Sequence, residues 1–385
     1  MKIILKHSRL LFGTMTCVWA CLFLSAKSMP TDLNHPELFG SYYYSQIFRS
    51  AQNSLSKFGQ EVNQSPGAST TKPLRTIRVT SLVRSIAISP DGKIIVSGND
   101  QGEVQLWNRN TEKLLYTFLR HSNWIQSVVF SPDGKLIASG SIDGTIKLWN
   151  LSTKKLIRTF EKSQPVYSLT FSPDGKLIAS GNGGGIIRLW DLNGKSIRNI
   201  KAHSGNVVSV VISPDGKTLA SRSFVSISNN NDTDIKLWNL STGNLIRALT
   251  AGETGGVNSL AISSDGNILA GYFSIQTAEA IRLWNFKTKE VIATLDVGIN
   301  RPHAIALAPD STTLAVGGFS NQIQIWNLST RQKLRTFISD ISNSQTYSLA
   351  FSLDRQTLVS AGSTGSGGFI TLWQVTPNST PSEQL

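Results

Sequence analysis

Seven tryptophans recur at intervals of 41 to 48 residues, and this repeat constrains the fold more than any other feature of the chain. They are Trp107, Trp149, Trp190, Trp238, Trp284, Trp326 and Trp373. Each ends an alternating stretch such as T-I-K-L-W at 145–149, which is the pattern of a half-buried β-strand. Several short strands in each of seven units indicate small sheets that bury their faces against one another.

An aspartate precedes each tryptophan, in most units within the sequence S-P-D-G. The seven are Asp91, Asp133, Asp174, Asp215, Asp265, Asp310 and Asp354. Proline, aspartate and glycine favour a tight turn, so each unit contains a turn between two strands.

The units resemble WD40 repeats, and the second unit (121–150) matches most fully: H-S-N-W-I-Q-S-V-V-F-S-P-D-G-K-L-I-A-S-G-S-I-D-G-T-I-K-L-W-N. The resemblance covers about residues 74–376, and the S-P-D-G-K turns are similar to those of bacterial members. The W-D dipeptide itself occurs only at Trp190-Asp191. The resemblance implies an all-β, seven-bladed β-propeller.

Closure of the ring can also be predicted. The last repeat contains three strands, at Tyr347–Ser352, Thr357–Ala361 and Phe369–Val375, and we expect residues 377–385 to be a disordered polar tail. The stretch L-R-T-I-R-V at 74–79 looks like the outer strands of the other units. We expect it to supply the outer strand of the last blade, as in the family.

Residues 1–28 have the pattern of an export signal. Three basic residues in 1–9 precede an uncharged apolar run of 15 residues at 10–24, and small residues follow. We expect cleavage before Met29 and a periplasmic or extracellular protein. Two alternatives stay open: a membrane anchor through residues 10–24, and lipidation at Cys21.

Residues 29–73 are predicted to form a short amphipathic helix and a polar linker. Tyr44, Phe48, Ala51, Leu55, Phe58 and Val62 form one apolar stripe on a helix of about 41–62. This helix packs on the propeller in one interpretation, and binds a partner or a membrane surface in the other.

Composition excludes several functions. Both cysteines lie in the leader, which excludes a disulfide framework or a thiolate zinc site in the repeats, and no two histidines have metal-ligand spacing. The net charge is +13, but the basic residues are spread over the repeats. We therefore expect no cofactor, no metal and no nucleic acid, and leave open weak contact with an anionic membrane or polysaccharide.

One set of polar residues could be mistaken for a catalytic triad. The resemblance implies that His121, Ser139, Asp143 and Trp149 form a hydrogen-bonded set inside the second blade. We interpret this set as structural, because buried Trp N–H and Ser groups need partners.

Family geometry places the loops between strands two and three on the same face as the start of strand one. The separation from turn aspartate to tryptophan is 16 residues in four units, but 23 in the fourth and 19 in the fifth and seventh. The predicted extended loops are Ser223–Asp234, Tyr272–Ala280 and Ser363–Gly368, and loops of this kind often carry function.

The residue seven before each turn aspartate should ring the channel mouth on that face. These residues are Arg84, Gln126, Tyr167, Val208, Asn258, His303 and Tyr347, with Trp124 and Phe273 nearby. Tyr, Arg and His suit protein contact, whereas the absence of a carboxylate in this ring argues against hydrolysis. An ordinary solvated rim is the alternative.

The sequence therefore favours a non-catalytic protein–protein interaction platform, built on a monomeric propeller outside the cytoplasm. This function is implied by the resemblance, since fold alone does not fix function. A propeller-fold hydrolase and a glycan or small-ligand binder are the alternatives.

Overall fold

The computed structural model describes residues 69–160, 164–224, 234–249, 259–275, 278–299 and 301–375. The predictions for the leader (1–28), the helix (41–62) and the tail (377–385) concern residues outside these ranges. The chain divides into the units Met1–Pro66 and Gly67–Leu385, and the second unit contains every described residue.

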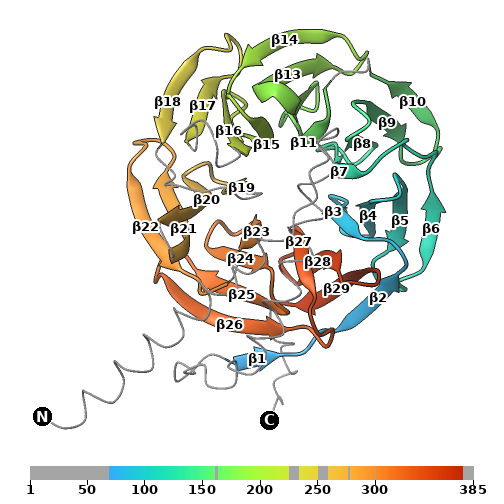
Figure 1. Cartoon of the computed structure of the whole chain (residues 1–385), viewed down its shortest axis with the longest axis vertical. Helices are drawn as coiled ribbons and strands as arrows, with labels where there is room; N and C mark the ends of the chain where they lie inside the picture. The colour runs from blue at the N-terminus through green and yellow to red at the C-terminus, as the bar shows by residue number, and fades with distance from the viewer. Residues whose placement is uncertain are drawn as a thin grey trace, which may run out of the picture. The chain divides into compact units, whose positions relative to one another are not determined.

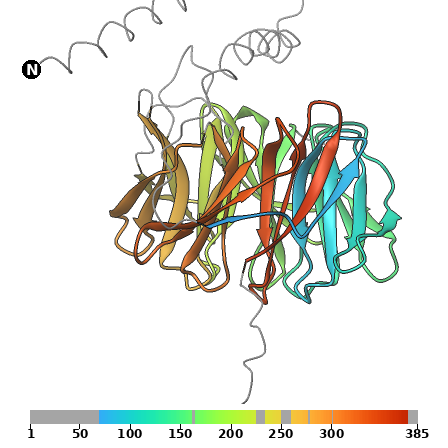
Figure 2. The ribbon, with the colours of Figure 1, turned by 90° about the horizontal axis from the view of Figure 1, so that it is seen from below.

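Seven sheets stand around a central axis in this unit (Figure 1). Six of the sheets have four strands and one has five, which confirms the predicted all-β, seven-bladed propeller. Seen from the side, the turns that join the strands gather on two opposite faces (Figure 2).

The first four blades follow the chain from the innermost to the outermost strand. Blade 1 contains β3 (Val83–Ile88), β4 (Ile94–Asn99), β5 (Val104–Asn108) and β6 (Leu114–Thr117). Blade 2 contains β7 (Ile125–Phe130), β8 (Leu136–Ser141), β9 (Ile146–Asn150) and β10 (Leu156–Thr159). Blade 3 contains β11 (Val166–Phe171), β12 (Leu177–Asn182), the 3-10 turn η2 (Gly183–Gly185), β13 (Ile186–Asp191) and β14 (Ser196–Lys201). Blade 4 contains β15 (Asn206–Ile212), β16 (Thr218–Phe224), β17 (Ile235–Asn239) and β18 (Leu245–Leu249).

The last three blades include two strands from the start of the propeller. Blade 5 contains β19 (Leu260–Ile262), β20 (Ile268–Ile275), β21 (Ala278–Asn285) and β22 (Val291–Asp296). Blade 6 contains β23 (Pro302–Leu307), β24 (Thr313–Gly318), β25 (Gln322–Asn327), β26 (Gln332–Ile338) and β1 (Ser69–Thr71). Blade 7 contains β27 (Gln345–Phe351), β28 (Thr357–Ser363), β29 (Gly368–Gln374) and β2 (Arg75–Val79).

The predicted closing strand is present. β2 pairs antiparallel with β29, from Arg75 opposite Leu372 to Val79 opposite Gly368, so the start of the propeller completes its last blade (Figure 1). Leu74, the predicted first residue, donates its amide proton to the Leu372 carbonyl at 2.9 Å. The ring is therefore closed by hydrogen bonds between segments almost 300 residues apart.

A strand that the sequence did not predict precedes this closure. β1 lies within the segment predicted to be a polar linker, and it pairs parallel with β26, with Ser69 opposite Arg335. Residues 69–79 therefore extend blade 6 and then complete blade 7. The sequence S-T-T is too short and too polar to show strand alternation, which explains why it was missed.

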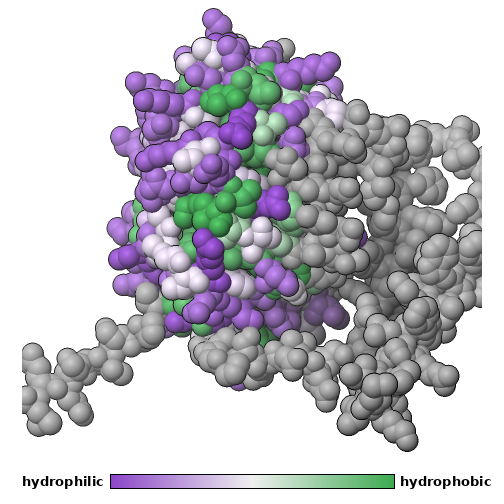
Figure 3. Space-filling model, turned by 90° about the vertical axis from the view of Figure 1, so that its left-hand side faces the viewer, coloured by the Kyte–Doolittle hydropathy of each residue, from purple (hydrophilic) through white to green (hydrophobic). Residues whose placement is uncertain are grey.

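Burial falls from the axis to the rim. Second strands such as β8 are buried on both faces, whereas every residue of the outer strands β6 and β10 is exposed. On β18 the exposed Leu245 and Ile246 adjoin Arg247. Figure 3 shows that apolar groups on one side of the rim are separated by hydrophilic side chains. Basic residues on an outer strand discourage pairing with another sheet edge.

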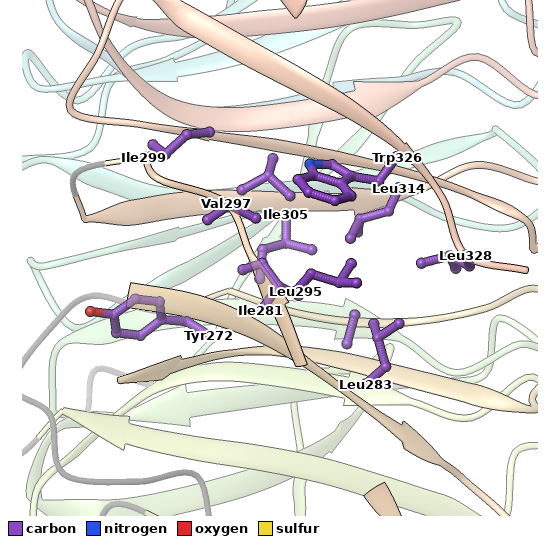
Figure 4. Close-up of a cluster of buried hydrophobic side chains, with 12 residues drawn as sticks. Tyr272, Ile281, Leu283, Leu295, Val297, Ile299, Ile305, Leu314, Trp326 and Leu328 are labelled. Carbon is purple, nitrogen blue, oxygen red and sulfur yellow. The ribbon is translucent and has the colours of Figure 1, made fainter. Parts of the chain in front are cut away.

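The core consists of seven apolar clusters, each shared by two adjacent blades. Between blades 5 and 6, for example, Ile281 and Leu283 pack against Ile305, Leu314 and Trp326 (Figure 4). Burying one such aliphatic side chain contributes about 1.5–3 kcal/mol. Each blade therefore depends on both neighbours for its stability.

Candidate binding site at one mouth of the central channel

The structure brings the described members of the predicted ring together around one cavity. The cavity has a volume of about 450 Å³ and is lined by Arg84, Gln126, Tyr167, Val208, His303 and Tyr347, each from a different blade. The seventh predicted member, Asn258, lies outside the described residues. We call this cavity the channel mouth.

A β-bulge places each of these side chains. In blade 1, Val83 pairs with Asn99 and Ser85 pairs with Gly98, so that Arg84 between them has no partner in the ladder. The same register shift occurs at the other five residues. A bulge leaves one residue unpaired and re-aims its side chain. These six lining residues are thus ones that the sheets do not use for pairing.

A belt of serines holds the blades together beside these bulges. The Ser85 hydroxyl accepts the amide proton of Val128 in the next blade at 3.0 Å. Four further bonds of 3.0–3.1 Å repeat this arrangement, at Ser127, Ser168, Ser209 and Ser348. The sequence contained the signal, because serine stands six residues before the turn aspartate in every unit except the sixth, which has Ala304. The belt fixes the walls of the mouth.

Arg84 supplies a positive charge to the mouth. Its guanidinium carbon lies 4.2 Å from the ring centroid of Trp124, whose side chain is 42% exposed. Burial lowers the pKa of Arg84, and electrostatic interactions with Tyr347 and Asp100 act in the opposite direction. No aspartate or glutamate is found among the described residues that line the cavity.

Three other polar side chains of the mouth are held by hydrogen bonds. Asn206 Nδ2 donates to the Tyr167 hydroxyl at 3.1 Å, and the Tyr347 hydroxyl donates to Gln345 Oε1 at 2.7 Å. The His303 ring lies edge-on to Tyr347, with centroids 6.2 Å apart. The mouth therefore presents aromatic faces and neutral hydrogen-bonding groups in fixed positions.

Phe273, predicted near the contact surface, is only 5% exposed and lies under the Arg282 guanidinium. The added residues of blade 5 lengthen the hairpin of β20 and β21, in which Phe273 pairs with Ala280. The predicted loop Tyr272–Ala280 is therefore mostly strand. Phe273 offers little surface to a partner because the longer hairpin buries it.

The other two predicted loops differ from each other. In Ser363–Gly368 the amide of Thr364 donates to the Gly367 carbonyl at 2.9 Å, so the insertion is a tight turn between long strands. Most of Ser223–Asp234 lies outside the described residues.

His121, Ser139, Asp143 and Trp149 form one hydrogen-bonded chain inside blade 2. His121 Nε2 lies 2.8 Å from Ser139 Oγ, and His121 Nδ1 lies 3.0 Å from Asp143 Oδ2. Trp149 Nε1 donates to Ser139 Oγ at 3.1 Å. Ser139 is completely buried, so a substrate has no access to its hydroxyl. This geometry supports the structural interpretation.

The hydrogen bonds inside blade 2 favour the ionised form of the Asp143 carboxyl. Burial would raise the pKa of its carboxyl, but hydrogen bonds from His121 and Thr145 outweigh burial and hold the pKa well below its usual value. Its contribution to stability is therefore present above the unfolded-state pKa, near 3.9, and is lost as the pH falls through the folded-state value.

The residues that the structure describes contain neither a candidate metal site nor a candidate membrane-spanning helix. No three His, Cys, Asp or Glu side chains gather there in a way that could hold a metal ion. Within the same ranges, no helix has the length and apolar character needed to cross a membrane.

Comparison with known proteins agrees with this architecture. A family model described as the IFT122 first beta-propeller matches residues 82–221. The apoptotic protease-activating factor 1 of Rattus norvegicus is 32% identical over 151 residues, which are 37% of this chain and 11% of that protein. The small ribosomal subunit protein RACK1y of Oryza sativa subsp. japonica is 30% identical over 154 residues, or 39% of this chain and 43% of that protein.

The fold and the repeated site define a seven-bladed β-propeller. The comparisons support a propeller of the WD40 type, a class that typically provides protein-interaction scaffolds. The matches span less than half the length of either relative, and what those whole proteins do is a separate matter.

Proposed function

We propose that this chain is a non-catalytic protein-interaction platform and that the channel mouth is its binding site. The observation that carries the proposal is the convergence of six bulged residues, from six blades, on one cavity. Arg84 and two tyrosines are of the residue types that dominate binding energy at protein interfaces. Because the serine belt fixes the walls, a partner meets a preformed surface, which lowers the entropy cost of binding.

The test compares the two ends of the channel. The purified chain, as wild type, as Tyr167→Ala/Tyr347→Ala and as Leu353→Ala, is used to capture partners, which are then measured by quantitative mass spectrometry. Leu353 is 60% exposed and lines a separate pocket, with Phe130 and Phe171, so it is a matched control. We expect the double variant to lose at least tenfold of each specific partner, while Leu353→Ala retains it. Equal recovery by the wild type and the double variant would contradict the proposal.

A small ligand or glycan is the second candidate for the same mouth. The volume of about 450 Å³ lies within the usual range for small-ligand sites, and serine and tyrosine hydroxyls line the wall. A glycan array probed with the wild type and the double tyrosine variant tests this candidate. Binding that both proteins share would exclude the mouth as the glycan site.

We also propose that the platform works outside the cytoplasm, on the basis of the apolar run at 10–24 and its basic start. Cell fractionation with antibodies against the propeller tests this location. Export is rejected if the full-length protein is found in the cytoplasm, and membrane anchoring is supported if the protein resists extraction by carbonate.

A further inference from the structure

We propose that the mouth accepts one acidic side chain, an aspartate or glutamate carboxylate from an extended partner segment, and that Arg84 binds it. This inference rests on the proposed function and names the chemistry of the partner. Its basis is the charge of the cavity: Arg84 is the one lysine or arginine among the described lining residues, and these include no acidic side chain.

The orientation of Arg84 suits a carboxylate. Its guanidinium carbon lies over the Trp124 ring, 4.2 Å from the ring centroid. A guanidinium that rests on an aromatic ring can still donate from the N–H groups along its edge. Two such N–H groups match the two oxygens of a carboxylate, and the resulting paired hydrogen bonds are stronger than neutral ones.

An unsatisfied donor supports this assignment. Arg84 Nε is buried and has no hydrogen-bond partner in the described structure. Leaving a buried donor unpaired costs about 1–3 kcal/mol, so such a group calls for an explanation. Nε itself is covered by protein atoms, so a bound carboxylate would accept from the Nη groups, and the unpaired Nε shows that the described protein supplies no competing acceptor on that edge of the guanidinium.

Asp100 is the competing negative charge. It acts electrostatically on Arg84, but no ion pair joins these two side chains within the described residues. The Asp100 Oδ1 atom is itself buried and lacks a hydrogen-bond partner there. Asp100 therefore lowers the attraction of the mouth for an anion without occupying Arg84, and its removal should strengthen binding.

The single cation favours a carboxylate over a phosphate. A phosphorylated side chain carries a charge of about −1.5 to −2 at pH 7, and its three oxygens suit a cluster of cations. The described wall of the mouth offers one guanidinium and the imidazole of His303, together with neutral Ser, Tyr, Asn and Gln groups, and only the guanidinium is permanently charged. One negative charge balances this wall, and neighbouring residues of the segment can lie against Trp124 and Tyr347.

The test uses an array of nonapeptides in matched sets that differ only at the central residue, which is Glu, Gln, Lys or phosphoserine. The full chain is applied as wild type, Arg84→Met, Arg84→Lys and Asp100→Asn, and the affinities of positive sequences are measured by fluorescence anisotropy. For the wild type we expect Glu peptides to bind about tenfold more tightly than their Gln partners. Arg84→Met should remove this preference, Arg84→Lys should retain part of it, and Asp100→Asn should increase it.

The outcomes separate this inference from the proposed function. If Glu and Gln peptides bind the wild type equally, and Tyr167→Ala/Tyr347→Ala abolishes both, the platform stands and the acidic occupant is rejected. Tighter binding of phosphoserine than of Glu peptides would overturn the choice of a carboxylate. If no peptide set binds the wild type, both the acidic occupant and peptide binding at the mouth are rejected. The contrast of Glu with Gln on the wild type needs no variant, so it decides the matter even if Arg84→Met does not fold.

Discussion

The seam between blades 7 and 1, where the ring closes, differs from the seam between blades 4 and 5. At the closing seam, Val83 and Ile86 of blade 1 pack against Val359 and Ile370 of blade 7. Two ion pairs also cross it: Arg109 Nη1 to Asp354 Oδ2 at 3.3 Å, and Arg75 Nη1 to Glu112 Oε1 at 2.6 Å. Among the described residues, no other ion pair joins two blades.

The seam between blades 4 and 5 contains a buried cation instead. Arg222 is 1% exposed and donates a hydrogen bond to the Tyr272 carbonyl. Its guanidinium carbon lies 5.6 Å from the Tyr272 ring centroid, and burial lowers its pKa to about 10. Four of the other six blades have glycine at this position, where the next blade packs directly against it, whereas blade 5 has Tyr272 and blade 7 has Ala361. A Cβ on Gly98, for example, would lie 2.5 Å from Ile125 Cγ2.

The difference reflects how the chain connects the blades. Blades 4 and 5 follow one another in the sequence, so the connecting chain limits their separation even if their contact is irregular. Blades 7 and 1 are joined through β2, which belongs to blade 7 and leads directly into β3. Closure depends on the bonds that β2 makes with β29, and the ion pairs add to them. Arg222 thus lies in a seam whose two blades are also held together by consecutive chain.

Removing the closing strand should have the largest effect on this comparison. We expect deletion of residues 1–80, which removes β1 and β2, to abolish the folded monomer, because it uncovers the edge of β29 and the apolar cluster of the closing seam. Deletion of residues 1–72 removes β1 alone and should leave a cooperative unfolding transition. Size-exclusion chromatography and calorimetry of both proteins provide the measurement. A monomeric, cooperatively folded 81–385 fragment would show that the closing seam does not need β2.

Truncating Arg222 should have the next largest effect. Arg222→Ala leaves a cavity between blades 4 and 5 and removes the hydrogen bond to the Tyr272 carbonyl, and we expect it to destabilise the fold by about 2–4 kcal/mol. The matched variant Gly98→Ala adds one methyl group where Ile125 and Val128 leave no room, and should cost about 1–3 kcal/mol. Urea unfolding measures both. If Arg222→Ala is neutral, the cation does not support its seam.

The smallest effect concerns the ion pair of Arg109 with Asp354. Burial would raise the pKa of Asp354, but Ser352, the Gln356 amide and Arg109 outweigh it and lower this pKa. The stabilisation is thus complete above the unfolded-state pKa, near 3.9, and is lost as the pH falls through the folded-state pKa. Arg109→Met should cost about 0.2–1 kcal/mol at pH 7, as surface pairs do, and less at pH 2.5. Chemical unfolding at both pH values tests this, and a cost that does not change with pH would exclude the ion pair as its cause.

The sequence predicted the repeated blades, the ring of mouth residues and the closing strand, but missed the serine belt and several features that occur once. The number of tryptophan repeats predicted the number of blades. The position of residues such as Arg84 and Tyr167 relative to the turn aspartate predicted that they line the channel mouth. Single departures were not predictable in this way. β1 has no alternating pattern, and the burial of Phe273 depends on where the inserted residues of blade 5 pair.

Arg222 illustrates the physical reason for this limit. Its position in the repeat is occupied by glycine in four of the seven units, so the pattern marks arginine as unusual there but does not say where its side chain goes. That depends on the spacing of two neighbouring blades, which is set by packing between residues about 50 positions apart. A local sequence pattern therefore does not predict a side-chain position that depends on one particular tertiary contact.

The bulges at the mouth have a consequence for how such a protein can change. At a bulge one residue has no pairing partner in the sheet, and the adjacent serine hydroxyl accepts a hydrogen bond from the next blade. Arginine, glutamine, tyrosine, valine and histidine all occupy this position in one chain without altering the strands around them. Under the proposed function, a mutation there would exchange one partner for another while folding stability is largely preserved. Stability and the proposed specificity would then be encoded by neighbouring codons and could evolve separately.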